Sequence, residues 1–123
     1  MISILSVTPQ FLVERLDDAL AYYEQRLGFT VDFVYEGFYA SVSRDGAAIH
    51  LKCAPKLQEE RAHRKAGEHL DAYLKVSGVR ELHEELAGRG ARIIKSLEER
   101  PWGMLDFYVE DSDGYVLCFS EAA

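Results

Sequence analysis

The pattern of apolar and polar positions divides the first half of the chain into strands around one amphipathic helix. Apolar residues recur at helical spacing over residues 16–27, and Gly28 is a typical helix-ending residue. Residues 4–13, before this helix, have the pattern of a strand. Asp45-Gly46 is a strong hairpin signal. It joins the last two of three β-rich runs, which cover residues 30–35, 38–43 and 47–53. The first half is therefore predicted to have the order β-α-β-β-β.

The second half repeats this order. Residues 70–76 are predicted to form a strand, and the following helix has Ser77 as its expected N-cap and Gly88 and Gly90 at its end. Three apolar residues mark the buried face of that helix: Val79, Leu82 and Leu86. Three further strands are predicted over residues 92–96, 104–110 and 115–120. Asp113-Gly114 precedes the last strand as Asp45-Gly46 precedes the strand that contains His50.

Self-similarity at half the chain length indicates two copies of one structural unit. We expect one α+β domain with a first module over about residues 1–54 and a second over about 69–123. The charged segment 54–69 is expected to connect them on the surface, with room for one helical turn. A unit with one helix covers only one face of its sheet, so the other faces must meet a ligand or a partner chain.

The overall charge narrows the range of ligands. The chain has 14 basic and 21 acidic residues and a formal net charge of −7. This balance argues against nucleic acid and favours a cationic ligand, although many cytosolic proteins are simply acidic. No apolar run is long enough to span a membrane, and the N-terminus does not resemble a signal peptide. We therefore expect a cytoplasmic protein with Cys53 and Cys118 as free thiols.

Several motifs for catalysis or metal binding can be set aside. The run 111–114, Asp-Ser-Asp-Gly, does not fit the calcium loop of an EF-hand and predicts a turn. His63 and His69 do not have metal-ligand spacing. The sequence contains no glycine-rich phosphate loop, no G-x-S-x-G motif and no paired-cysteine zinc signature.

Three stretches of the sequence carry a family resemblance. They are "LDDALAYYEQRLGFTVDFVYEGF", "RPWG" and "FYVEDSDGYVLCFSE". Together they resemble the vicinal oxygen chelate superfamily of glyoxalase I, extradiol dioxygenases and bleomycin resistance proteins, and are most similar to the last group. The resemblance implies two βαβββ modules that form a cupped mixed sheet, usually in a homodimer.

The resemblance also implies where a metal would bind in the enzymes of this superfamily. The four ligand positions correspond to Thr8, His50, Asp71 and Cys118, where a working site typically has His, Gln and Glu. Thr8 is a poor ligand, and Cys118 replaces an expected carboxylate. We therefore expect no metal and no other cofactor. The alternative is a metal-dependent lyase or dioxygenase of the glyoxalase type, with His50, Asp71 and Cys118 as atypical ligands.

Without a metal, the resemblance implies a binding protein. Bleomycin resistance proteins are dimers that hold a flat, cationic glycopeptide in grooves between subunits by means of aromatic side chains. The corresponding aromatic positions here are Phe33, Phe38 and Trp102, and strand alternation adds Tyr73 and Tyr108. His50 completes the set of expected ligand-binding residues. The structural alternatives are core or interface for the two phenylalanines, surface for the tyrosines and a lid over the core for Trp102.

Overall fold

The computed structural model describes residues 1–3, 5–54 and 70–123 and contains the same arrangement twice. Module 1 consists of β1 (Gln10–Val13), α1 (Leu16–Gln25), β2 (Thr30–Tyr35), β3 (Tyr39–Arg44) and β4 (Ala47–Cys53). Module 2 consists of β5 (Ala72–Lys75), α3 (Val79–Gly88), β6 (Arg92–Glu99), β7 (Met104–Glu110) and β8 (Val116–Ala122). The predicted α+β fold of two βαβββ modules is confirmed.

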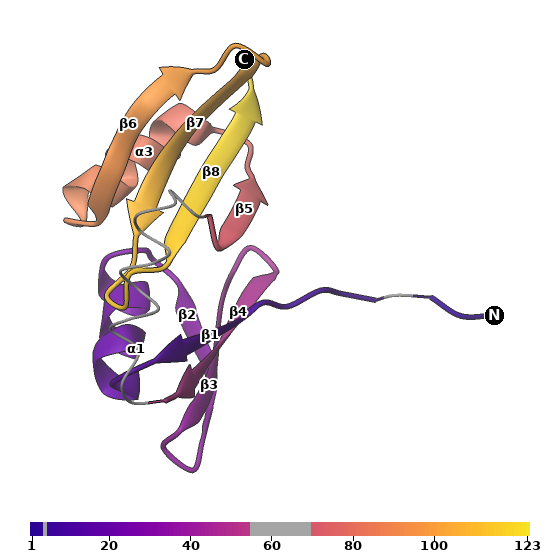
Figure 1. Ribbon diagram of the computed structural model, residues 1–123, viewed down its shortest axis with the longest axis vertical. Helices are drawn as coiled ribbons and strands as arrows, with labels where there is room; N and C mark the ends of the chain where they lie inside the picture. The colour runs from indigo at the N-terminus through magenta and orange to yellow at the C-terminus, as the bar shows by residue number, and fades with distance from the viewer. Residues whose placement is uncertain (4, 55–69) are drawn as a thin grey trace.

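The strand order is equivalent in the two modules. Module 1 has the order β1-β4-β3-β2 and module 2 the order β5-β8-β7-β6, as two separate four-stranded sheets (Figure 1). In each sheet the first strand is parallel to the last strand, and the other pairs are antiparallel. Gln10 pairs with His50 in module 1, and Tyr73 pairs with Cys118 in module 2. This register confirms the predicted equivalence of His50 and Cys118.

Each helix covers one face of its own sheet. In module 1, every second side chain along the strands points toward α1 and is buried beneath it. These residues are Phe11, Val13, Ala40, Val42, Ile49 and Leu51. The same alternation in module 2 places Phe107, Val109, Leu117 and Phe119 beneath α3. Among the described residues, no helix packs on the opposite face of either sheet, and we call this the open face of that module.

The turn between β7 and β8 joins module 2 to module 1. The Tyr115 hydroxyl accepts a hydrogen bond from the Leu12 amide at 2.8 Å and donates one to the Leu12 carbonyl at 2.7 Å. The buried Tyr23 hydroxyl donates to the Asp111 carboxylate at 2.8 Å, and the Glu14 amide donates to Asp113 at 2.9 Å. Burial raises the pKa of Asp111 to about 6, because the charged form loses its solvation.

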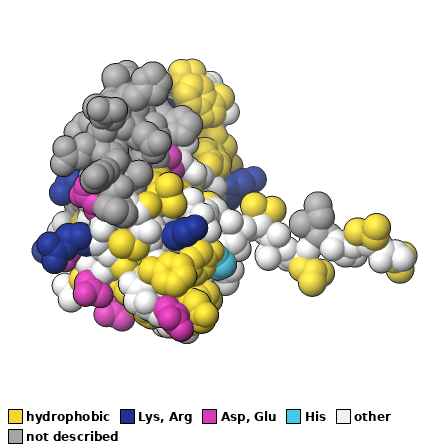
Figure 2. All heavy atoms as spheres, turned by 60° about the horizontal axis from the view of Figure 1, so that its bottom comes forward, with side chains coloured by type: hydrophobic (Ala, Val, Ile, Leu, Met, Phe, Trp, Pro, Cys, Tyr) yellow, Lys and Arg dark blue, Asp and Glu magenta, His cyan; other side chains and the backbone are white. Residues whose placement is uncertain are grey.

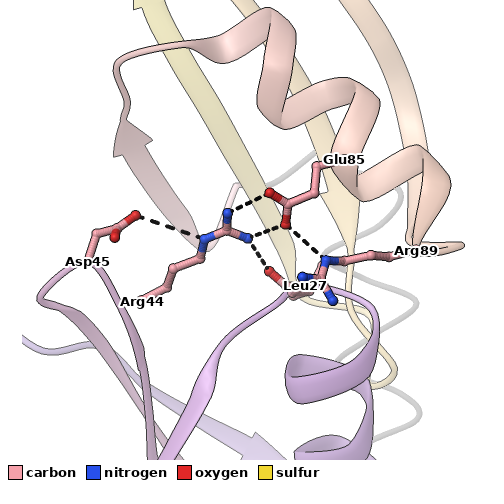
Figure 3. A network of polar contacts seen from close by, with 5 residues as sticks. All are labelled: Leu27, Arg44, Asp45, Glu85 and Arg89. Carbon is pink, nitrogen blue, oxygen red and sulfur yellow. Dashed lines mark hydrogen bonds and ion pairs between the residues drawn. The ribbon is translucent and has the colours of Figure 1, made fainter.

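A second contact between the modules is an ion pair on the other side of this joint. The Arg44 guanidinium binds both carboxylate oxygens of Glu85 on α3, at 2.7 and 2.8 Å, and donates to the Leu27 carbonyl (Figure 3). Arg89 approaches the same carboxylate at 2.9 Å. Hydrogen bonding to Arg44 lowers the pKa of Glu85 to about 2. The two contacts hold the modules in a fixed relation.

The N-terminus and the start of α3 differ from the prediction. The first strand begins at Gln10 rather than at residue 4, and the segment before it extends away from the body of the chain with its apolar side chains exposed (Figure 1). Pro9 lacks the amide hydrogen needed to extend a ladder. The N-cap of α3 is Gly78 and not Ser77. The Glu121 carboxylate accepts hydrogen bonds from the backbone amides of Gly78 and Val79.

Other predictions concern segments between and beyond these elements. The expected connection over residues 54–69, with His63 and His69, lies outside the described residues except for Ala54. The run 111–114 forms a turn as predicted, and Cys53 and Cys118 are free. None of the helices in the described residues is both long and apolar enough to cross a membrane.

Candidate ligand-binding site

The open face of module 1 carries a continuous cluster of rings. The Phe33 and Tyr39 rings are parallel with centroids 6.4 Å apart, and His50 stands edge-on to both, at 6.0 and 5.4 Å. Phe38 and then Tyr35 extend the cluster in edge-to-face contacts of 6.5 and 5.8 Å. We call these five residues the aromatic face.

The aromatic face is accessible although it is apolar. Phe33, Tyr35 and Phe38 are 46%, 58% and 43% exposed. Figure 2 views the molecule from the module 1 end and shows hydrophobic side chains gathered around a histidine at the base of the projecting N-terminal segment. Contiguous apolar surface of this kind marks binding sites on soluble proteins.

A chain of hydrogen bonds fixes His50 within the aromatic face. The Gln10 side-chain amide donates to the Tyr39 hydroxyl at 3.0 Å, and that hydroxyl lies 2.8 Å from Nδ1 of His50. The direction of the Tyr39–His50 hydrogen bond depends on the His50 tautomer. When Tyr39 donates to Nδ1, His50 carries its proton on Nε2 and presents a donor to a bound molecule.

The open face of module 2 is built from charged pairs. Arg100 donates to the buried Asp106 carboxylate at 2.7 Å and to Glu98 at 3.1 Å. Lys95 and Arg100 lie 5.2 and 5.5 Å from the centroid of the Tyr108 ring. Tyr73, an exposed residue of β5, donates its hydroxyl hydrogen to Ser120 at 2.8 Å.

Five of the six predicted ligand-binding residues are divided between these two faces, and the sixth lies in a connection. Phe33, Phe38 and His50 come together in module 1, whereas Tyr73 and Tyr108 lie on the open face of module 2. Trp102 is 68% exposed in the β6–β7 connection. This connection and the β2–β3 connection lie at opposite ends of the molecule (Figure 1). One chain therefore does not bring Trp102 into a groove with Phe33 and Phe38.

A cleft forms a third location. It has a volume of about 870 Å³ and lies between the two modules. Its wall contains large apolar side chains, among them Leu27, Phe29 and Phe119, together with the Arg44–Glu85 pair. Of the six predicted residues only Tyr73 reaches it. We place the candidate site on the aromatic face instead, because it brings together three of the six predicted residues in contacting rings around a hydrogen-bonded histidine.

Tyr35, Tyr39 and Gln10 are members or supports of this site that sequence reasoning missed. Tyr35 follows Phe33 by two positions along β2, so the alternation rule could have placed it on the same face. Tyr39 faces Tyr35 across the β2–β3 pair. The partner of Tyr39 in the hydrogen-bond chain, Gln10, gave no sequence signal because it is far away along the chain.

The four positions that correspond to the superfamily's metal ligands do not fit a divalent metal here. Burial raises the pKa of the Cys118 thiol to about 12, which disfavours the thiolate that a metal requires. The Asp71 carboxylate accepts the Val116 amide at 2.9 Å, and His50 Nδ1 is engaged by Tyr39. Among the described residues, no group of three or more His, Cys, Asp or Glu side chains is arranged to hold a metal.

Comparison with known proteins agrees with this architecture. A family model described as the Glyoxalase/Bleomycin resistance protein/Dioxygenase superfamily matches residues 4–119. The structure is similar to the bleomycin-binding protein of Streptomyces verticillus complexed with copper(II)-bleomycin, with 22% identity, a TM-score of 0.78 and 100% of both chains covered. A search of curated protein sequences found no match.

Two further solved structures have the same fold. A bleomycin resistance determinant encoded on the transposon Tn5 is 21% identical, with a TM-score of 0.78 over 95% of this chain and 97% of that chain. A glyoxalase-related enzyme from Clostridium phytofermentans is 19% identical, with a TM-score of 0.79 over 99% and 98%. Because a binding protein and an enzyme share this fold, the function must be argued from the site.

Proposed function

The chain belongs to the glyoxalase/bleomycin resistance protein/dioxygenase superfamily, and we propose that it is a metal-independent binding protein that sequesters a flat aromatic or cationic small molecule. The observation that carries the proposal is the aromatic face, where five rings are in mutual contact and three remain about half exposed. Stacking on such rings contributes about 0.5–1.5 kcal/mol per pair beyond the area buried. A structurally similar protein that binds bleomycin gives this proposal its ligand class.

We further propose that a second copy of the chain completes the groove. The exposed N-terminal segment presents Met1, Ile2, Leu5 and Val7, which a monomer would leave in water. A two-fold dimer could place Trp102 and Tyr108 of the partner opposite the aromatic face of the first chain, which one chain does not do. Deletion of residues 1–7 should then shift the protein from dimer toward monomer in sedimentation experiments at micromolar concentration.

Titration with metal-free bleomycin tests the binding proposal. Calorimetry should give saturable binding to the wild-type protein, and Phe33→Ala should weaken it by about tenfold through loss of stacking. Ile94→Ala is the matched control, because Ile94 is an apolar residue of β6 that is 44% exposed and lies outside the aromatic face. Absence of saturable binding, or equal losses in both variants, would reject the aromatic face as the site.

Elemental analysis tests metal independence. Purified protein should carry no stoichiometric divalent metal, and a chelator should leave its melting temperature unchanged, since removal of a tightly bound ion would lower stability by mass action. One tightly bound zinc, nickel or iron per chain would reject this part of the proposal and favour a glyoxalase-type enzyme.

A further inference from the structure

The second strand of module 1 contains an irregularity that changes where one carboxylate points. Val31 pairs with Val42 and Phe33 pairs with Ser41, so Asp32 is an extra residue between two consecutive pairs. In a regular strand Asp32 and Phe33 would point to opposite faces of the sheet. A bulge re-aims such a side chain, and bulges are frequent beside binding sites. Here it brings a negative charge to the open face beside Phe33.

Two serines hold this carboxylate in place. Oδ2 of Asp32 accepts the hydroxyl hydrogen of Ser41 at 2.9 Å, and Oδ1 accepts that of Ser43 at 2.7 Å. Ser41 and Ser43 lie on the open face, because the residue between them, Val42, is fully buried on the helix side. An ionised carboxylate offers about four acceptor positions, so each oxygen keeps capacity for a further donor.

The surroundings of Asp32 combine a ring surface with a single negative charge. Asp32 is exposed, and the adjacent Phe33 ring is about half exposed. On the same open face, Lys52 and His50 lie on β4, and β3 separates them from Asp32. The paired open-face positions of module 1 carry no acidic side chain, so the bulged Asp32 brings the negative charge to this part of the face.

We propose that Asp32 determines the charge specificity of the site by pairing with a protonated amine or other fixed positive charge attached to a flat ring system. The ring stacks on the Phe33 and Tyr39 side of the aromatic face while the cation contacts the Asp32 carboxylate. A cation beside the Phe33 ring also gains from the negative potential of the ring face. This inference rests on the proposed function and adds to it the residue that selects a cationic ligand.

A pair of probes that differ mainly in charge tests the assignment. At pH 7, 9-aminoacridine is a cation and acridine is neutral, and both are planar tricyclic molecules. Fluorescence titration of the wild-type protein should show roughly fivefold tighter binding of 9-aminoacridine, the size expected for one exposed charge pair with a cation–π contribution. Asp32→Asn should remove this preference and leave acridine binding unchanged.

The control variant is Asp17→Asn, which alters the net charge by the same amount on the exposed side of α1. It should keep the wild-type preference, which separates the local effect of Asp32 from the general attraction of an acidic protein for cations. Asparagine keeps an oxygen acceptor for the serines, so the melting temperature of Asp32→Asn should stay close to that of the wild type.

The possible outcomes separate this inference from the proposed function. Loss of the preference in Asp32→Asn alone supports the assignment. Equal wild-type affinities for the two acridines, a preference that survives in Asp32→Asn, or no binding of either acridine by protein that binds bleomycin would overturn it. Failure of the wild-type protein to bind bleomycin as well would overturn the proposed function itself.

Discussion

The open faces of the two modules share one backbone arrangement but have opposite chemistry. In module 1 the position beside Gln10 is His50, surrounded by exposed rings; in module 2 the equivalent position is Cys118, fully buried beside Tyr73. The aromatic face of module 1 leaves its apolar surface in water. The open face of module 2 instead satisfies its charges internally through the Arg100–Asp106 pair.

This difference separates stability from binding within one repeated unit. A buried and paired charge is costly to disturb, because removal of one partner leaves the other without compensation. An exposed ring contributes little to folding and remains available for a ligand. Substitutions on the module 2 face should therefore change stability, and substitutions on the module 1 face should change affinity.

The largest expected effect comes from Arg100→Ala. Arg100 is 13% exposed and Asp106 only 2%, so the variant leaves a buried carboxylate without its cation. The free energy of unfolding should fall by about 3–5 kcal/mol in urea denaturation. Glu98→Gln, at the exposed end of the same network, should cost less than about 1 kcal/mol. Similar small losses in both variants would show that the module 2 face is not held by its charges.

The joint between the modules should respond to pH through Asp111. Because the folded pKa of Asp111 is about 6, above its ordinary value, the folded protein holds a proton there between about pH 4 and 6 that the unfolded chain has released. Stability from this group is therefore present at low pH and lost as pH rises through 6, by about 2–3 kcal/mol in all. Urea denaturation across this range should show the loss in the wild type and not in Asp111→Asn.

Glu85, at the other contact between the modules, should give stability the opposite dependence on pH. Its pKa is lowered to about 2, so its contribution is present above about pH 4.5 and is lost as pH falls toward 2. Between pH 4.5 and 6.5 the contribution of Glu85 to stability is therefore constant, and only that of Asp111 changes. A wild-type stability that follows that of Asp111→Asn throughout this window would contradict the buried, protonated state of Asp111.

A smaller effect should distinguish the aromatic face from an aromatic residue of module 2. Phe33→Ala should weaken bleomycin binding about tenfold while lowering the free energy of unfolding by less than about 1 kcal/mol, because the ring is already about half exposed. Tyr73→Ala, at an exposed aromatic position of module 2, should weaken binding less. A larger loss of affinity in Tyr73→Ala would move the site to module 2.

The smallest effect on stability is expected for Trp102→Ala. The indole is 68% exposed, so the melting temperature should fall by no more than a few degrees, whereas a core tryptophan would cost about 3–5 kcal/mol. Because Trp102 is the only tryptophan, its fluorescence reports on this position alone. Emission that responds to bleomycin in dimers, but not in protein shortened by residues 1–7, would support a groove between two chains.

The sequence allowed the fold and half of the site to be predicted. Matching the two Asp-Gly turns was enough to make His50 and Cys118 equivalent positions, whereas Phe33 and Phe38 were expected at the candidate site through the family resemblance. The bulge at Asp32 could not be foreseen, because the extra residue is defined only by the pairing of β2 with β3. The contact of Tyr115 with Leu12 joins residues too far apart in the chain for any local pattern to indicate.

Mapping amide chemical shifts during titration with metal-free bleomycin decides whether module 1 binds the ligand on its aromatic face. The largest changes should fall on β2, β3 and β4, around Phe33, Tyr39 and His50, with smaller changes near Trp102 from the second copy. Changes confined to the cleft between the modules, or to β5 and β8, would contradict this placement of the site.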